Sequence, residues 1–150
     1  MSKQVAANLH VPLETTLLVR DSCLCLHVQR AARALARLFD DAMRDVGITS
    51  GQFSLMMSLN RPMPPSIGSV AQLLAMDRTT LTAALKPLER RGLVEVSVDP
   101  RDRRGRLLTL TEAGQKLLKQ AVPIWERTHA GVEAMVSDAN GLRAGLLALA

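Results

Sequence analysis

Apolar positions repeat every three or four residues between residues 14 and 46, which is the period of one helix face. The pattern predicts a single helix of about 25–30 residues that ends at Gly47, preceded by a flexible arm over residues 1–13. A helix of that length is too long for a compact chain of 150 residues to cover, so part of it should pack on another subunit. The stripe consists of Leu24, Val28, Ala31, Leu35, Leu38, Ala42 and Val46.

Three capping signals divide the middle of the chain into short helices. Thr49 with Gln52 is a capping-box pattern that opens one helix, and the proline-rich stretch at residues 61–65 breaks it. Ser66 can cap the next helix and Asp77 the one after it, because both side chains can accept a hydrogen bond from a free backbone N–H. The last of these helices has an apolar stripe of Leu81, Leu85 and Leu88.

A hairpin and a long helix are expected next. Strict alternation over residues 94–98 predicts a strand, residues 106–110 predict the return strand, and the charged residues 99–105 predict the turn between them. Thr111 can cap the long helix. Residues 138–141 allow a break before a short apolar helix.

The composition fits one globular domain with a basic surface. Of 150 residues, 47% are apolar and 22% charged, so we expect an ordered core. Nineteen lysines and arginines outnumber fourteen acids, and fifteen of the nineteen are arginines. Arginine suits phosphates and base edges, so nucleic acid is a candidate partner beside the alternative of a merely soluble basic protein. Scarce aromatic side chains favour a duplex over single strands.

No pattern indicates secretion, membrane insertion or catalysis. The first nine residues contain no apolar segment and no apolar run approaches the about 18 residues of a span, so we expect a cytoplasmic protein. Cys23 and Cys25 are expected within one helix, where side chains two residues apart do not face each other, and we expect them reduced. We expect no catalytic residue, metal or cofactor, because no nucleophile motif, phosphate loop or metal spacing accompanies the three histidines, His10, His27 and His129.

Two short helices followed directly by a basic hairpin predict a winged helix-turn-helix. Such a fold can place a helix in the major groove of DNA and its wing in the adjacent minor groove. The second helix presents polar side chains away from its apolar stripe, namely Arg78, Thr79, Thr80, Thr82 and Lys86. The hairpin crowds four arginines whose repulsion favours an anionic partner, namely Arg101, Arg103, Arg104 and Arg106. These nine residues are the expected DNA contacts, and the alternative is a winged helix that binds only protein.

Two stretches of this region are similar to the signature of a known family. Residues 92–94 (Gly-Leu-Val) and 99–104 (Asp-Pro-Arg-Asp-Arg-Arg) lead to Leu-Thr-Glu-Ala-Gly at residues 110–114. Residues 69–74 (Ser-Val-Ala-Gln-Leu-Leu) with Asp-Arg-Thr-Thr-Leu at residues 77–81 resemble a helix-turn-helix. On these motifs the chain resembles the MarR family of bacterial transcription regulators.

The resemblance covers roughly residues 20–137 and carries expectations about the fold. It implies a mainly α-helical protein with a small β-wing, a MarR-like winged helix-turn-helix that dimerises through its N- and C-terminal helices. It also implies one domain over residues 14–150. Within that domain the winged helix would occupy about 49–111 and the dimerisation helices about 14–46 and 112–150.

The resemblance also implies roles for single residues. Arg103 would be the wing-tip arginine that enters the minor groove, where a narrow groove concentrates negative potential. Asp99, Asp102 and Arg104 would hold the wing. Many members have an arginine in the middle of the recognition helix, where this chain has two alanines, so base contacts would depend more on its threonines.

By the same resemblance the chain would be a homodimeric repressor that binds a pseudo-palindromic operator and is released by a small ligand. Family members commonly bind small aromatic or phenolic anions between the dimerisation helices and the DNA-binding part. The alternative is that the residues available in that region simply form an ordinary apolar core. The residues available there are His27, Arg30, Phe39, Met43, Phe53 and Met57.

A second regulatory hypothesis concerns Cys25. Peroxide-sensing members keep a reactive cysteine near the start of the first long helix, where Cys25 falls. Those members support the thiolate with tyrosines, but this chain has no tyrosine and has Phe39 where one is expected. A thiolate without donors or a nearby cation is hard to stabilise, so the competing expectation is an inert, buried thiol.

Overall fold

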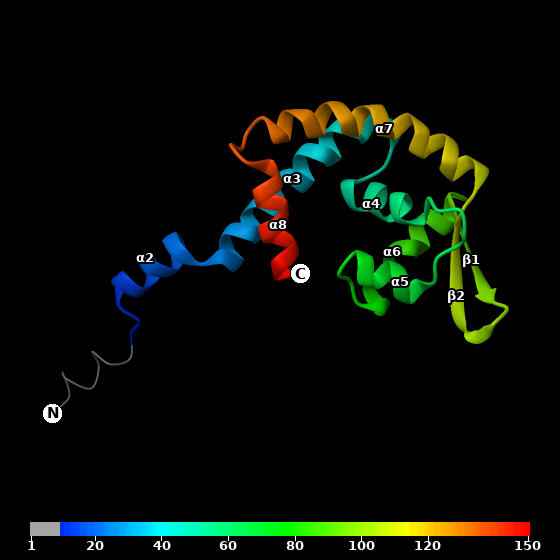
Figure 1. Ribbon diagram of the computed structural model, residues 1–150, viewed down its shortest axis with the longest axis horizontal. Coiled ribbons are helices and arrows are strands. Elements are labelled where there is room, and N and C mark those ends of the chain that lie inside the picture. The colour runs from blue at the N-terminus through cyan, green and yellow to red at the C-terminus, as the bar shows by residue number, and fades with distance from the viewer. Residues whose placement is uncertain (1–9) are drawn as a thin grey trace. The chain divides into compact units, whose positions relative to one another are not determined.

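The computed structural model describes residues 10–150 and is mostly helical, with one two-stranded antiparallel sheet (Figure 1). This confirms the prediction of a mainly α-helical fold with a small β-wing. The elements before the sheet are α2 (Leu13–Ser22), α3 (Leu24–Ala42), the 3-10 turn η2 (Arg44–Val46), α4 (Ser50–Leu59), α5 (Ile67–Leu73) and α6 (Arg78–Arg90). The strands β1 (Val94–Asp99) and β2 (Asp102–Leu110) follow, and then α7 (Glu112–Glu133) and α8 (Ala139–Leu149).

The described chain forms two compact units, and the boundary falls within α3 between Arg37 and Leu38. The first unit contains α2 and most of α3, and the second contains the remaining elements. The single domain over residues 14–150 therefore stays a prediction. Residues 1–9 of the expected arm lie outside the described residues, and the first described helix begins at Leu13.

The prediction of one continuous helix over residues 14–46 is wrong. Cys23 is extended (φ −71°, ψ 108°) between α2 and α3, and its N–H donates to the carbonyl of Val19 at 3.0 Å. Cys23 and Cys25 consequently do not share a helix, contrary to expectation. One extended residue interrupts the helix without proline or glycine, so the apolar period alone could not reveal the break.

The second unit is built around the core of the winged helix. The expected caps are present: Thr49 forms a capping box with Gln52, Ser66 accepts from the N–H of Ser69, and Asp77 caps α6. Capping fixes where each helix begins, so the apolar stripes of neighbouring helices face a common centre. The side chains fully buried there are Met43, Met56, Val70, Leu81, Leu85, Leu88 and Leu108.

A sharp turn joins α5 to the recognition helix α6. Ala75 adopts a left-handed conformation (φ 51°), which is uncommon for a residue with a Cβ. The N–H of Met76 donates to the carbonyl of Ala71 at 2.8 Å and closes the turn. α6 then begins at Arg78 and continues through Pro87.

The wing differs from its prediction at the tip. The strands pair from Val94 with Leu110 to Val98 with Arg106, as expected, but β2 begins at Asp102. Residues 102–105, predicted as turn, therefore belong to the strand. An irregular register between Val98 and Asp99 accommodates the additional residues of β2.

The proline-rich stretch does more than end α4. The carbonyl of Pro65 accepts a hydrogen bond from the N–H of Leu108 at 2.9 Å, and Ser66 forms a bridge with Leu107 of β2. This pairing ties the segment before α5 to the inner edge of the wing. The sequence showed the break but not the partner, because the partner is more than forty residues away in the chain.

The start of α7 is fixed to the segment between α6 and β1. The hydroxyl of Thr111 donates to the carbonyl of Gly92 at 2.6 Å, and its N–H donates to that of Leu93 at 3.1 Å. The same hydroxyl caps α7 by accepting from the N–H of Gly114 at 3.0 Å. The recognition helix, the wing and α7 thus share one hydrogen-bonded junction.

A break separates the last two helices, but it comes earlier than predicted: residues 139–141, expected to lie in the break, already belong to α8. α7 continues through Pro123 and ends at Glu133, and Asp138 caps α8 by accepting from the N–H of Gly141. Arg143 of α8 donates to Glu133 at 2.6 Å, and this lowers the pKa of Glu133. Among residues 10–150 no helix is both long and apolar enough to cross a membrane.

Candidate nucleic-acid interface

The recognition helix α6 exposes the polar face that was predicted for it. All five expected contacts on this helix are exposed. The hydroxyl of Thr80 donates to the carboxylate of Asp77 at 2.7 Å, and that of Thr82 donates to the carbonyl of Arg78 at 2.7 Å. Both hydroxyls keep only their acceptor capacity for an outside partner. Thr79 makes no such side-chain bond within the described residues, so its hydroxyl can donate or accept.

Arg78 lies against the preceding helix rather than pointing freely outward. A Cβ placed on Gly68 of α5 would lie 2.7 Å from Nη2 of Arg78. The guanidinium therefore rests on the bare backbone of Gly68, which positions it at the start of α6. No local pattern indicates this role for Gly68, because the two residues meet only after α5 and α6 pack.

Two aspartates hold the backbone of the wing tip. Asp99 accepts from the N–H of Arg101 at 2.9 Å, and Asp102 accepts from the N–H of Arg104 at 3.0 Å. Such bonds from a side chain to a backbone N–H two residues further on fix a turn. This geometry supports the predicted role of both aspartates in stabilising the wing.

The four wing arginines differ in their contacts. One supports the backbone of the hairpin tip, and the guanidinium groups of the other three form no hydrogen bond within residues 10–150. The guanidinium of Arg106 donates to the carbonyls of Arg103 (3.1 Å) and Gly105 (3.0 Å), so it supports the tip from within. Arg101, Arg103 and Arg104 are exposed. No wing arginine forms an ion pair within residues 10–150, and the four arginines outnumber the two aspartates of residues 99–106, so this tip carries a net positive charge.

The comparisons with known proteins point to one family. A model of the MarR family matches residues 48–105. The chain is 34% identical to the transcriptional activatory protein BadR of Rhodopseudomonas palustris, over 61% of this chain and 54% of BadR. It is 31% identical to the transcriptional repressor NicR of Pseudomonas putida, over 64% of this chain and 61% of NicR. The matched part thus spans little more than half the length of these curated relatives.

A solved structure extends the likeness to nearly a whole chain. The transcriptional regulator MosR of M. tuberculosis, crystallised in complex with DNA, is 34% identical with a TM-score of 0.80, over 85% of this chain and 93% of MosR. The chain belongs to the MarR family. Membership confirms the predicted MarR-like winged helix-turn-helix, while the DNA contacts of individual residues stay predictions.

The cap of the recognition helix makes the stability of this MarR-family chain depend on pH. The hydroxyl and the backbone N–H of Thr80 hold the pKa of the Asp77 carboxyl below its ordinary value. The ionised cap stabilises the fold above about pH 4, and this contribution is lost as the pH falls through the lowered pKa. Between pH 7 and pH 3 we therefore expect a larger fall in the melting temperature of the wild type than of Asp77→Asn, whose amide still caps but does not titrate. If circular dichroism showed that the melting temperatures of the wild type and of Asp77→Asn fall by the same amount, this expectation would be contradicted.

The residues predicted for the ligand pocket belong to two different units. Phe39, Met43 and Phe53 line a small hollow of about 130 Å³ in the second unit. His27 and Arg30 belong to the first unit, so their part in a pocket stays a prediction. Nδ1 of the His27 ring lies 2.8 Å from the carbonyl oxygen of Cys23, which is within hydrogen-bond distance.

Trp125 is the pocket residue that the sequence did not single out. Its ring stacks on Phe53 with centroids 6.2 Å apart and on His129 with centroids 4.6 Å apart. It also lines the small hollow and a larger one of about 420 Å³. Only the packing of α7 against α4 brings Trp125 to Phe53, so its place in the pocket cannot be found from the period of the long helix.

Cys25 is exposed in this protomer, so the expectation of a buried thiol is wrong. Its sulfur accepts a hydrogen bond from the side-chain amide of Gln29 at 3.4 Å. No residue of α2 or α3 is buried in the protomer, so the exposure of Cys25 is shared by the whole segment. A redox role stays a prediction. If hydrogen peroxide leaves Cys25 unmodified by mass spectrometry and operator affinity unchanged, that role is excluded.

Proposed function

We propose that this MarR-family chain is a sequence-specific regulator of transcription that binds double-stranded DNA. The observation that carries the proposal is that one compact unit presents both an exposed polar face on α6 and a wing tip with exposed arginines and a net positive charge. A helix of this kind fits the major groove, and a basic two-stranded wing fits the adjacent minor groove. The likeness to MosR, which was crystallised with DNA, supports the same partner.

The working form is a homodimer. Apolar side chains on α3 remain exposed in the protomer, among them Leu24 and Val28. The same holds on α8 for Leu142, Leu147 and Leu149. Exposed apolar faces of this extent mark interaction surfaces, and a second copy would cover them. A two-fold dimer would then bind a pseudo-palindrome with half-sites about one helical turn apart.

The regulator would act as a repressor that a small molecule releases, in the cytoplasm where the bacterial chromosome lies. A dimer that occupies both half-sites excludes other proteins from the same DNA. Release by a ligand requires that the ligand bind the free form more tightly than the DNA-bound form. The hollows beside Trp125 offer a place for such a ligand.

Fluorescence anisotropy with labelled DNA from upstream of the encoding gene tests the proposal. We expect the logarithm of the association constant to fall linearly with the logarithm of salt concentration, with a slope of about −0.9 per contacted phosphate. A scrambled duplex of equal length should bind far more weakly at physiological salt. A protein-binding winged helix would show neither the slope nor the preference.

A further inference from the structure

Four exposed side chains of α6 lie on the side of the helix that faces away from its buried leucines. They follow the helical spacing of three and four residues, so they form one stripe, here called the groove stripe. If α6 enters the major groove, the groove stripe is the part of the helix that meets the base edges. It consists of Thr79, Thr82, Ala83 and Lys86.

The hydroxyl of Thr82 has no hydrogen left for a base. It donates to the carbonyl of Arg78, four residues earlier in α6, at 2.7 Å. A threonine hydroxyl carries a single hydrogen, so only the oxygen lone pairs and the γ-methyl group remain for an outside partner. Ala83, the next residue, offers a methyl group alone. The middle of the groove stripe therefore presents two methyl groups and no side-chain donor.

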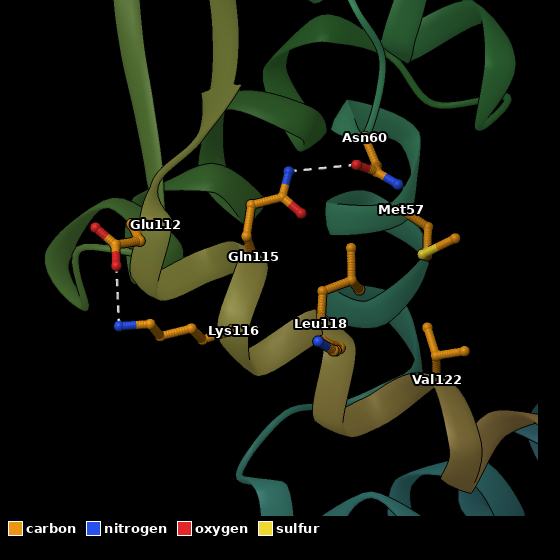
Figure 2. A pocket seen from close by; sticks show the side chains of 8 residues that line it. Met57, Asn60, Glu112, Gln115, Lys116, Leu118 and Val122 are labelled. Atoms are coloured by element: carbon orange, nitrogen blue, oxygen red, sulfur yellow. Dashed lines mark hydrogen bonds and ion pairs between the residues drawn. The ribbon is translucent and has the colours of Figure 1, made fainter.

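Side-chain donors lie at the two ends of the groove stripe. The hydroxyl of Thr79 makes no hydrogen bond within residues 10–150, so it can donate. Lys86 forms no ion pair within that range, whereas Lys116 of α7 is paired with Glu112 at 3.0 Å (Figure 2). A guanine presents only acceptors in the major groove, so its recognition needs a donor opposite it. The ends of the groove stripe meet this need and the middle does not.

The neighbouring polar side chains of α6 do not supply the missing donors. The hydroxyl of Thr80 donates to the carboxylate of Asp77 at 2.7 Å. The guanidinium of Arg78 rests on Gly68 of α5, with Nη2 2.7 Å from the place that a Cβ of Gly68 would occupy. Both groups are engaged at the start of the helix. Methyl groups are therefore the chemistry that the middle of the groove stripe has for telling one base from another.

We propose that Thr82 and Ala83 determine specificity by selecting thymine in the middle of each operator half-site through its 5-methyl group. Thymine is the base that carries an apolar group on its major-groove edge, and threonine and alanine methyl groups suit contact with it. The amino group of a cytosine could donate to the Thr82 oxygen, but it would find no acceptor at Ala83. The inference rests on the proposed function and names the base that this helix reads.

Replacing thymine with deoxyuridine tests the contact, because uracil keeps the pairing edge and lacks only the methyl group. The probe is the duplex footprinted upstream of the encoding gene, with one symmetric pair of thymines replaced at a time. At one or two positions we expect the affinity to fall about 4-fold for each half-site by fluorescence anisotropy, as for the exposure of one methyl-sized group. Thr82→Ser, which loses the methyl group and keeps the hydroxyl, should abolish this fall at one position. Thr82→Val, which keeps a methyl group and loses the hydroxyl, should retain it.

Thr128→Ser is the matched control, because the hydroxyl of Thr128 makes the same bond to the carbonyl four residues earlier, at 2.9 Å, but on α7. It should leave the sensitivity to deoxyuridine unchanged, and unchanged melting temperatures establish that all three variants are folded.

Three results overturn the proposal: no fall with deoxyuridine at any position, a fall that persists everywhere in Thr82→Ser, or a fall that is also lost in Thr82→Val or Thr128→Ser. Binding of the unsubstituted duplex is measured first and separately. If that duplex is bound no better than a scrambled one, the proposed function itself is refuted, and this inference with it. Specific binding without sensitivity to deoxyuridine refutes this inference alone.

Discussion

Replacing Gly114 with alanine is expected to lower the free energy of unfolding by about 3 kcal/mol. A Cβ at this buried position would overlap the carbonyl oxygen of Leu93 and lie 3.3 Å from the side chain of Leu110. The overlapped atom is backbone and is held by Thr111, so it cannot move aside as a flexible side chain would. For a chain of this size the melting temperature should fall by roughly 10 °C.

Gly131 provides the matched control because it lies in the same helix. Nothing lies within 4 Å of a Cβ built on Gly131, so alanine there only improves helix propensity. We expect Gly131→Ala to raise the free energy of unfolding by about 0.5–1 kcal/mol. If both variants shifted in the same direction in urea titrations, the close approach of α7 to Leu93 would not be what requires glycine at residue 114.

Loss of Arg103 is expected to have the largest effect on DNA binding. Its guanidinium is exposed at the wing, and its backbone carbonyl is held by Arg106. Arg103→Ala should weaken operator binding by about 1–3 kcal/mol and, if the lost contact is to a phosphate, reduce the salt slope by about one. Anisotropy titrations at several salt concentrations measure both quantities.

Arg127→Ala separates a local contact from a change in net charge. Arg127 is an exposed residue of α7, so its loss removes the same charge outside the wing and α6. We expect almost unchanged operator affinity for this variant. Equal losses for Arg103→Ala and Arg127→Ala would show that overall charge, rather than the wing tip, governs binding.

Much of the fold could be predicted because its signals are local. The caps at Thr49, Ser66, Asp77 and Thr111 each depend on a side chain and a backbone N–H a few residues away, and all four are present. The apolar stripe of α6 depends only on the helical period. The arginine-rich hairpin could be found for the same reason, because strand alternation and a turn lie within residues 94–110.

The errors fall where a single residue departs from a regular pattern. Cys23 is extended inside an apolar period that continues past it, and the strand at the wing tip begins three residues before the turn was expected to end. The break at Cys23 involves no glycine or proline and no change of the apolar period, and the early start of β2 lies in a charged stretch without strand alternation. The exposure of Cys25 could not be predicted because no residue of α2 or α3 is buried in the protomer, although the apolar period had suggested a packed face.

The sequence by itself determined that this chain has a helix-turn-helix followed by a basic wing, because capping, periodicity and charge act between near neighbours. Only the tertiary structure decided that Gly114 meets the backbone of Leu93 and that Trp125 stacks on Phe53. The residues in these contacts are 21 to 72 positions apart in the chain. They arise when α7 packs against α4 and against the segment between α6 and β1, and no local pattern encodes them.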